Sequence, residues 1–261
     1  MISYIKSELY RILHNKGSYL FILICSALLI SVNVILALVG HGDETFRYDN
    51  TGFSLPLLYT SFSMIFILCI SVTSIVFGNE HNHHTMKNTV SYGISRGSIY
   101  FGKLITTFIY ALSAFLIIVG LFILSSYALL ENSQSQDLVR LFKVCLVALP
   151  LLLFAVAASN CFFFLIESTG GAITTIVITL VAFPEISNYL AMKFKFFQML
   201  AKILPWNLIN NISFDFQTDS PNLLLPWEGM SGYYNYWLFG ILQLVLFALL
   251  GYVVFRRKEI K

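Results

Sequence analysis

The chain has 261 residues, of which 57% are hydrophobic and 11% charged, with a formal net charge of +3 and a mean hydropathy of +0.78. Soluble domains carry about 25% charged residues, so this chain has too little polar surface to cover a water-soluble fold. The length leaves no room for a soluble ATPase domain, and the small positive charge does not indicate a nucleic acid partner. We therefore expect an all-α integral membrane protein with a single transmembrane domain over residues 1–261.

Residues 1–17 predict an amphipathic helix at the membrane surface. The apolar residues recur at helical spacing, at Ile2, Ile5, Leu9 and Ile12. Basic residues fill much of the remaining surface, at Lys6, Arg11, His14 and Lys16. No small-residue cleavage signature follows, so we expect an interfacial helix and not a cleaved signal.

Six apolar segments then reach the roughly 20 residues that a membrane span requires. They cover about residues 18–39, 57–77, 99–128, 139–166, 170–190 and 235–255. Residues 191–234 form the longest connection, and they open with an apolar stretch that carries regularly placed lysines. This pattern predicts short helices that lie in the outer interface or re-enter the membrane.

Lysines and arginines predict the orientation. If the N-terminus is cytoplasmic, ten of these residues lie inside and six lie outside. Because cytoplasmic loops carry the excess of basic residues, we expect both termini in the cytoplasm. Residues 78–98 then form a cytoplasmic loop, and residues 191–234 form an extracellular segment.

Three polar residues inside the apolar segments are candidates for a translocation path: Asn33, Asn160 and Glu185. Interhelical hydrogen bonds are the alternative explanation for both asparagines. Glu185 follows Pro184, which frees a backbone carbonyl in the fifth span. A carboxylate at that depth needs a partner or water, unless it already lies among the lipid headgroups.

Residues 78–90, GNEHNHHTMKNTV, hold three of the five histidines. A metalloprotease needs the order HExxH, but here Glu80 precedes His81, His83 and His84. Glu80 and His84 lie at i and i+4, yet no further cluster completes a metal sphere. The cysteines are scattered among apolar runs, at Cys25, Cys69, Cys145 and Cys161. We expect no metal site and no catalytic residue, and an intramembrane metal-dependent enzyme that uses the three histidines is the alternative.

Residues 97–104, GSIYFGKL, nearly match a phosphate-binding P-loop. Leu104 stands where a P-loop needs serine or threonine to hold magnesium, and no strand precedes the segment. Any ATP must therefore be bound by another chain.

The segment from Glu80 to Lys103 resembles the ABC-2 family of transporter permeases. Its members show an acidic residue after the second span, a short Gly-Thr-like run, and then Ser-Arg and Lys before the third span. Here Ser95 and Arg96 supply the Ser-Arg pair, Ser95 is suited to cap the next helix, and His84-Thr85 replaces Gly-Thr. The amphipathic start, six spans and the basic tail FRRKEI extend the resemblance to the whole architecture.

The resemblance implies the permease subunit of an ATP-driven exporter, which is not itself an enzyme. Two permeases, identical or homologous, would dock on two copies of an ABC ATPase, which would bind ATP and magnesium, whereas this chain would bind no cofactor. The loop after the second span would form the coupling helix, with these coupling residues: Glu80, His84, Thr85, Lys87, Ser95, Arg96 and Lys103.

The chain most resembles permeases that export peptide antibiotics or give immunity to lantibiotics. This implies a multi-pass protein of the bacterial cytoplasmic membrane that moves an amphipathic peptide, or another membrane-partitioned toxic compound, out of the cell or the membrane. Membrane lipid is a further expected partner. Histidines in the loop would make coupling sensitive to pH near neutrality. A secondary transporter or a membrane scaffold is a further alternative, although no convincing pair of ionisable residues lies near the bilayer midplane.

Overall fold

The computed structural model describes residues 1–42, 48–83, 91, 93–132, 136–210, 213–215, 222–224 and 230–258. The first half contains α1 (Ile2–Leu13), α2 (Lys16–Gly42), α3 (Thr51–Thr60), α4 (Met64–His83) and α6 (Arg96–Leu129). The second half contains α7 (Gln136–Leu165), α8 (Thr169–Val177), the π-helix η1 (Ile178–Ala182), α9 (Phe183–Ala191), α10 (Lys195–Ala201), α11 (Pro205–Asn210) and α12 (Met230–Arg257). Two short strands, β1 (Ser213–Asp215) and β2 (Asn222–Leu224), pair antiparallel with Phe214 opposite Leu223.

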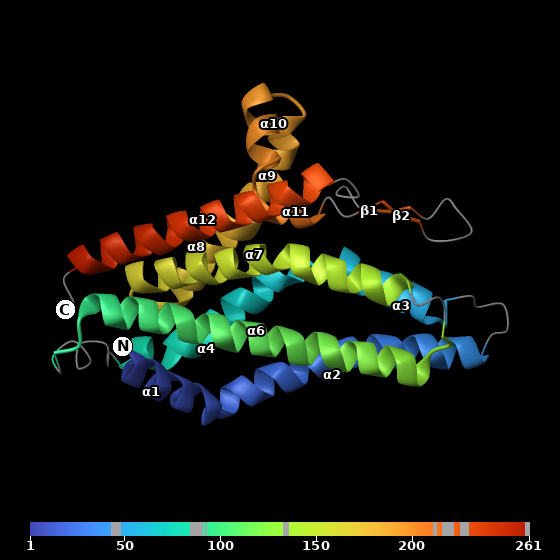
Figure 1. Cartoon of the computed structure of the whole chain (residues 1–261), viewed down its shortest axis with the longest axis horizontal. Coiled ribbons are helices and arrows are strands. Elements are labelled where there is room, and N and C mark those ends of the chain that lie inside the picture. The colour runs from blue at the N-terminus through green and yellow to red at the C-terminus, as the bar shows by residue number, and fades with distance from the viewer. Residues whose placement is uncertain are drawn as a thin grey trace.

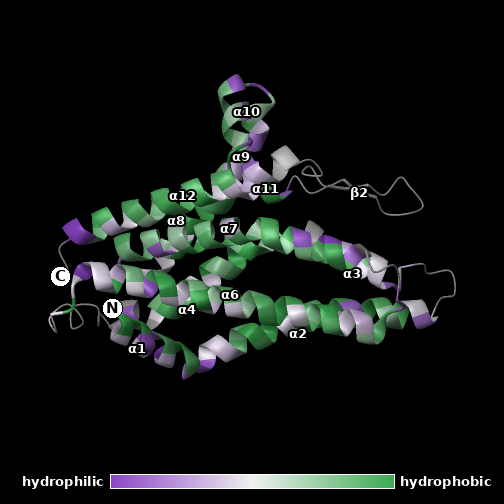
Figure 2. Ribbon diagram, in the orientation of Figure 1, coloured by the Kyte–Doolittle hydropathy of each residue, from purple (hydrophilic) through white to green (hydrophobic). Residues whose placement is uncertain are grey.

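The long helices run side by side and are hydrophobic along most of their length (Figures 1 and 2). In the described part of the chain, five helical segments are long and apolar enough to cross a membrane. They are Lys16–Gly42, Arg96–Leu129, Asp137–Leu165, Thr169–Ala191 and Tyr234–Arg257. A helical multi-pass membrane protein is therefore confirmed, whereas the apolar part of α4, Met64–Gly78, is shorter than these five.

The predicted second span, 57–77, differs most from the structure. It is divided between α3 and α4 by a turn at 61–63, where the backbone changes to i→i−3 hydrogen bonds. The N–H of Met64 donates to the carbonyl of Ser61 at 3.0 Å, and the N–H of Ile65 donates to that of Phe62 at 2.9 Å. The helix α4 then continues past the apolar stretch, through Glu80 to His83.

The core lies around α7, which packs against α12, α4, α8, α3 and α6. In its most apolar 18-residue window 67% of the residues are buried, compared with 11% for α2, so α7 is central and α2 peripheral. The small residues Ala155, Ala157 and Ala158 are fully buried, which lets neighbouring helices approach closely. Gly240 of α12 has the same effect, because a Cβ there would lie 2.9 Å from the Cβ of Pro150.

The predicted fifth span is one continuous helical segment built from α8, η1 and α9. Pro184 lacks a backbone N–H, and the helix widens into a π-turn just before it. The N–H of Phe183 accordingly donates to the carbonyl of Ile178, five residues earlier. After this segment, α9 and α10 pack together and project from the bundle, and α11 returns to it (Figure 1).

Candidate coupling site where α1, α4 and α6 meet

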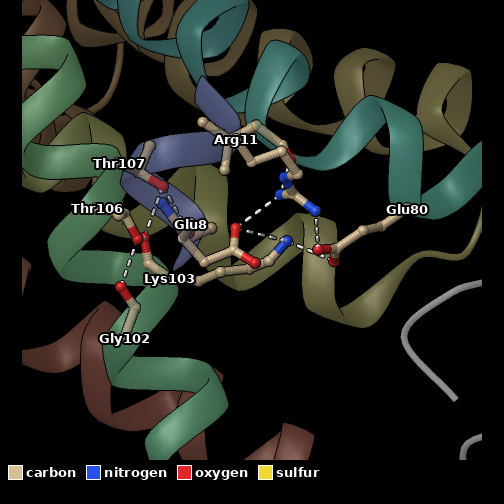
Figure 3. A network of polar contacts seen from close by, with 9 residues as sticks. Glu8, Arg11, Glu80, Gly102, Lys103, Thr106 and Thr107 are labelled. Carbon is tan, nitrogen blue, oxygen red and sulfur yellow. Dashed lines mark hydrogen bonds and ion pairs between the residues drawn. The ribbon is translucent and has the colours of Figure 1, made fainter. Parts of the chain in front are cut away.

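Four charged side chains from three helices meet at the end of α4. Glu8 and Arg11 come from α1, Glu80 from α4 and Lys103 from α6 (Figure 3). The Nη1 atom of Arg11 lies 2.5 Å from Oε1 of Glu80, and its Nη2 atom lies 2.6 Å from Oε2 of Glu8. Lys103 pairs with Glu80 and lies 3.9 Å from Glu8. We call these four residues the charge cluster.

The charge cluster is almost closed to solvent. The side chain of Lys103 is 0% exposed and those of Glu8 and Glu80 are each 7% exposed, while Arg11 is 34% exposed. Buried charges are tolerated only when they are paired, and here two anions balance two cations. Lys103 is held by charge and not by a well-aligned hydrogen bond, with its Nζ atom 4.3 Å from the centre of the Phe77 ring.

The pKa values of Glu80 and Arg11 show that the pairing of these two side chains outweighs their burial. Burial by itself would raise the pKa of Glu80, but the charges of Lys103 and Arg11 lower it below its usual range. Burial likewise opposes the charged form of Arg11, yet Glu80 and Glu8 raise its pKa. Burial raises the pKa of the neighbouring Tyr4, and Glu8 and Glu80 raise it further, so the phenol stays neutral. Glu80 and Arg11 therefore keep their charges at neutral pH.

The sequence around Lys103 allows α1 to lie directly on α6. Gly102 faces Tyr4 of α1, and a Cβ at this position would come within 2.6 Å of the Tyr4 ring. Thr106 and Thr107 turn their hydroxyls back to the carbonyls of Gly102 and Lys103, at 2.5 Å and 2.8 Å (Figure 3). These two hydroxyls are thereby satisfied within α6.

A second set of contacts ties the start of α6 to the ends of α12 and α7. Arg96 donates from Nη1 to the carbonyls of Phe255, Arg256 and Lys258, at 3.2, 2.9 and 2.6 Å. These carbonyls end α12 and have no partner within the helix, and a cation there also complements the helix dipole. Lys258 in turn donates to the carbonyls of Phe164 and Leu165 at 3.2 and 3.0 Å, which end α7.

The structure brings part of the predicted coupling set together. Glu80 and Lys103 are in contact, and Ser95 is the N-cap of α6, as predicted, where its hydroxyl accepts from the N–H of Ser98 at 3.3 Å. Both Glu80 and Lys103 are buried, so neither presents a charge to a docking partner. The remaining predicted coupling residues lie outside the described residues: His84, Thr85 and Lys87.

Sequence reasoning missed Glu8 and Arg11, which complete the charge cluster, and Lys258. The amphipathic pattern of the first helix placed Ile2 on its apolar face, but Ile2 is 71% exposed, whereas Glu8 is buried beside Ile12. An acidic residue in an otherwise basic helix, three residues before Arg11, was the available signal.

The three candidates for a translocation path bond to separate neighbours. Asn33 accepts from Ser54 at 2.6 Å and donates to the hydroxyl of Ser125 at 2.8 Å, which joins α2, α3 and α6. Asn160 donates to the carbonyl of Val156 in its own helix at 2.9 Å, and its Oδ1 atom lies 3.5 Å from the Thr107 hydroxyl of α6. Both asparagines are fully buried. These contacts favour interhelical hydrogen bonding for Asn33, whereas the 2.9 Å bond of Asn160 stays within α7.

Glu185 is partly buried and has hydrogen-bond partners of its own. Its Oε1 atom accepts from the indole N–H of Trp206 at 2.7 Å and from the amide of Asn210 at 3.4 Å. The Trp206 ring packs 5.6 Å from that of Phe66 on α4. Glu185 therefore fixes α11 to α9.

A metal site is not found among the described residues, where no three or more histidine, cysteine or acidic side chains are placed to hold an ion. The side chains of His81 and His83, and all of His84, lie outside the described part of the chain. The histidine-based alternative therefore stays a prediction that the structure does not test.

Comparison with known proteins gives one family. A family model described as "ABC-2 family transporter protein" matches residues 4–184, which is more than half of the chain and includes all four residues of the charge cluster. No curated protein matches the chain significantly. The role of this family is membrane transport, and its membrane subunits generally pair with an ABC ATPase. The chain therefore belongs to the ABC-2 family of transporter proteins and is a permease of that type.

Proposed function

We propose that the chain is the permease subunit of an ATP-driven exporter and that the segment between α4 and α6 is its coupling element. The charge cluster carries this proposal. It lies where α4 leaves the bundle, close to the segment that joins α4 to α6, and it ties both helices to α1. A docking partner that moved this segment would act on three helices at once.

The contacts suggest how such a movement would spread. Opening the charge cluster would leave buried charges unpaired, which is costly, so α1, α4 and α6 are expected to move as one body. Arg96 would extend this body to the end of α12, and Lys258 would extend it from there to the end of α7. ATP-driven closure of the partner would thus move both the peripheral α2–α6 pair and the central α7–α12 pair.

The remaining arrangement follows the family. We propose that α3 and α4 together form one crossing, which gives six spans with both termini in the cytoplasm of a bacterium. Two copies of an ABC ATPase would bind ATP and magnesium on that side, and a second permease, identical or homologous, would complete the complex. The histidines at 81, 83 and 84 would lie at the ATPase contact.

An apolar groove supports a cargo that partitions into membranes. The groove has a volume of about 370 Å³ and lies where α2 and α6 flank the turn between α3 and α4. Its lining includes Phe21, Leu29, Phe62, Leu68 and Phe115, with hydroxyls only from Ser61 and Ser71 among the residues that line it. Sites of this size and composition suit apolar or amphipathic ligands. We propose an amphipathic peptide or a similar toxic compound.

The proposal is tested by purifying the chain with candidate ABC ATPases from the same genome and measuring association and ATP turnover. The variants Glu80→Lys and Arg96→Glu should each lower permease-dependent ATP turnover about tenfold or more. Glu80→Lys places a cation beside Lys103 and Arg11. Arg96→Glu places an anion at the carbonyls that end α12, where the helix dipole is also negative. Arg140→Glu, at the opposite end of α7, is the control and should retain turnover. If both test variants associate and turn over ATP like the parent, the coupling assignment is wrong.

A further inference from the structure

The α9–α10 hairpin projects from the helix bundle and leaves large hydrophobic side chains uncovered (Figure 1). Met192 is 84% exposed, Met199 73%, and Tyr189 and Phe196 72% each. α10 packs against α9 and has no comparably extensive packing against the other elements that the structure describes. A contiguous exposed apolar surface of this kind marks a site where a protein or a membrane binds.

The same hairpin is positively charged. Residues 186–214 contain three lysines, Lys193, Lys195 and Lys202, and no aspartate or glutamate. All three lysines are exposed, and two of them alternate with Phe194 and Phe196 at the turn between the helices. Glu185, at the base of the hairpin, is engaged by Trp206 and Asn210. The hairpin therefore offers cations beside apolar side chains, without a neutralising carboxylate of its own among these residues.

The base of the hairpin is fixed to the first half of α12, between Tyr236 and Gln243, away from the two termini. Gln243 donates to the carbonyl of Ile203 at 2.9 Å, and Tyr236 donates to that of Leu208 at 2.8 Å. Asn188 of α9 donates to the side chain of Asn207 at 2.8 Å, which locks α11 to the hairpin. Because α12 ends at Arg257 beside the termini, its first half lies toward the opposite end of this membrane-spanning helix.

We propose that the α9–α10 hairpin is a lipid-binding element that lies in the leaflet opposite the termini and binds the phosphate groups of anionic phospholipids. Its apolar side chains enter the acyl region, and the lysines reach up to the headgroups, as lysine and aromatic residues do at membrane interfaces. The charge of the hairpin selects anionic over zwitterionic lipid. The proposal is independent of any ATPase partner.

The first test measures lipid selectivity on the purified full-length chain. Native mass spectrometry compares retention of phosphatidylglycerol with that of phosphatidylcholine of the same acyl chains. The parent should prefer phosphatidylglycerol, and Lys193→Gln, Lys195→Gln and Lys202→Gln together should reduce the preference by about fivefold for each lysine lost. The control is Lys143→Gln, an exposed lysine of α7, which should leave the preference unchanged. An unchanged preference in the triple variant, or an equal loss in the control, would overturn the proposal.

The second test locates the hairpin. Phe196→Trp is placed in vesicles of phosphatidylglycerol and phosphatidylcholine with brominated acyl chains, and the added tryptophan emission is measured relative to the parent. Quenching of the added emission is expected. If the added emission is not quenched, the hairpin does not lie in the acyl region and the proposal fails. The proposal also fails if a cysteine introduced by Met192→Cys crosslinks two copies of the chain, because the hairpin is then covered by protein.

Discussion

Lys103 of α6 and Glu80 of α4 form an ion pair that is buried on both sides, although the two residues lie on different helices and on opposite sides of a polar loop. Burying charges costs free energy that is recovered only while both partners are present. The pair therefore fixes the relative position of α4 and α6 and does not simply add stability.

Removal of one partner of the Lys103–Glu80 pair should destabilise the protein more than removal of both. Glu80→Gln leaves Lys103 and Arg11 with Glu8 as the only remaining carboxylate of the charge cluster, and we expect it to destabilise the protein by about 3–5 kcal/mol. Adding Lys103→Met should restore part of that loss. Thermal unfolding of the detergent-purified protein measures both variants. Glu167→Gln, a 70% exposed carboxylate, is the control and should change the midpoint little. If the double variant is less stable than the single one, the pair is not the determining interaction.

The stability from Glu80 should depend on pH only in acid. Because the folded-state pKa of Glu80 lies below the usual 4.5, its contribution is fully present above about pH 4.5 and is lost as the pH falls through the lower folded value. The difference in unfolding midpoint between the parent and Glu80→Gln should stay constant from pH 8 to pH 5 and shrink below pH 4. A difference that changes between pH 6 and 8 would point to the histidines of the loop instead, and His81→Gln with His83→Gln would then remove it.

Arg96 should control the order of the last turn of α12. Arg96→Gln removes charged hydrogen bonds to the carbonyls that end the helix, which are worth about 1.5–3 kcal/mol each when intact. We expect amide hydrogens near residues 252–258 to exchange faster with solvent, as measured by hydrogen–deuterium exchange mass spectrometry. Arg257→Gln, an exposed arginine that ends α12, should leave this exchange nearly unchanged. Equal acceleration in both variants would contradict the capping role.

Gly102 should be required for the contact between α1 and α6. Gly102→Ala places a methyl group against the Tyr4 ring and should displace α1, which lowers the unfolding midpoint. Tyr4→Ala in the same protein should relieve the clash and recover part of the loss. The control is Gly120→Ala in the same helix, where the added methyl meets no atom within 4 Å and should be neutral or slightly stabilising. Similar losses at both glycines would show that close packing at Gly102 is not the cause.

The long spans could be predicted from the sequence because a bilayer imposes a length and an apolar composition on each crossing. The helix over Arg96–Leu129 and its Ser95 cap were predictable from local chemistry, and the resemblance pointed to Glu80 and Lys103. The turn at 61–63 was not predictable, since neither glycine nor proline lies in it to mark the break.

The charge cluster was only half predictable for a different reason. Glu8 and Arg11 acquire their role from partners that are many residues away in the sequence, and Arg11 and Glu80 are 69 positions apart. Helical periodicity describes how residues share one face of a helix but not which other helix that face meets. The pattern of α1 therefore predicted an amphipathic helix but not the contact of Glu8 and Arg11 with α4 and α6.

The contrast between α7 and α2 has a consequence for how related sequences diverge. Substitutions at the buried positions of α7 must keep the volume of the side chain, because residues such as Ala155, Ala157 and Ala158 are fully buried in a closely packed core. In α2, apart from buried positions such as Asn33, any residue of suitable hydrophobicity is compatible with lipid contact. Sequence variation among homologues should therefore be greatest in α2, and sequence identity should be highest in α7.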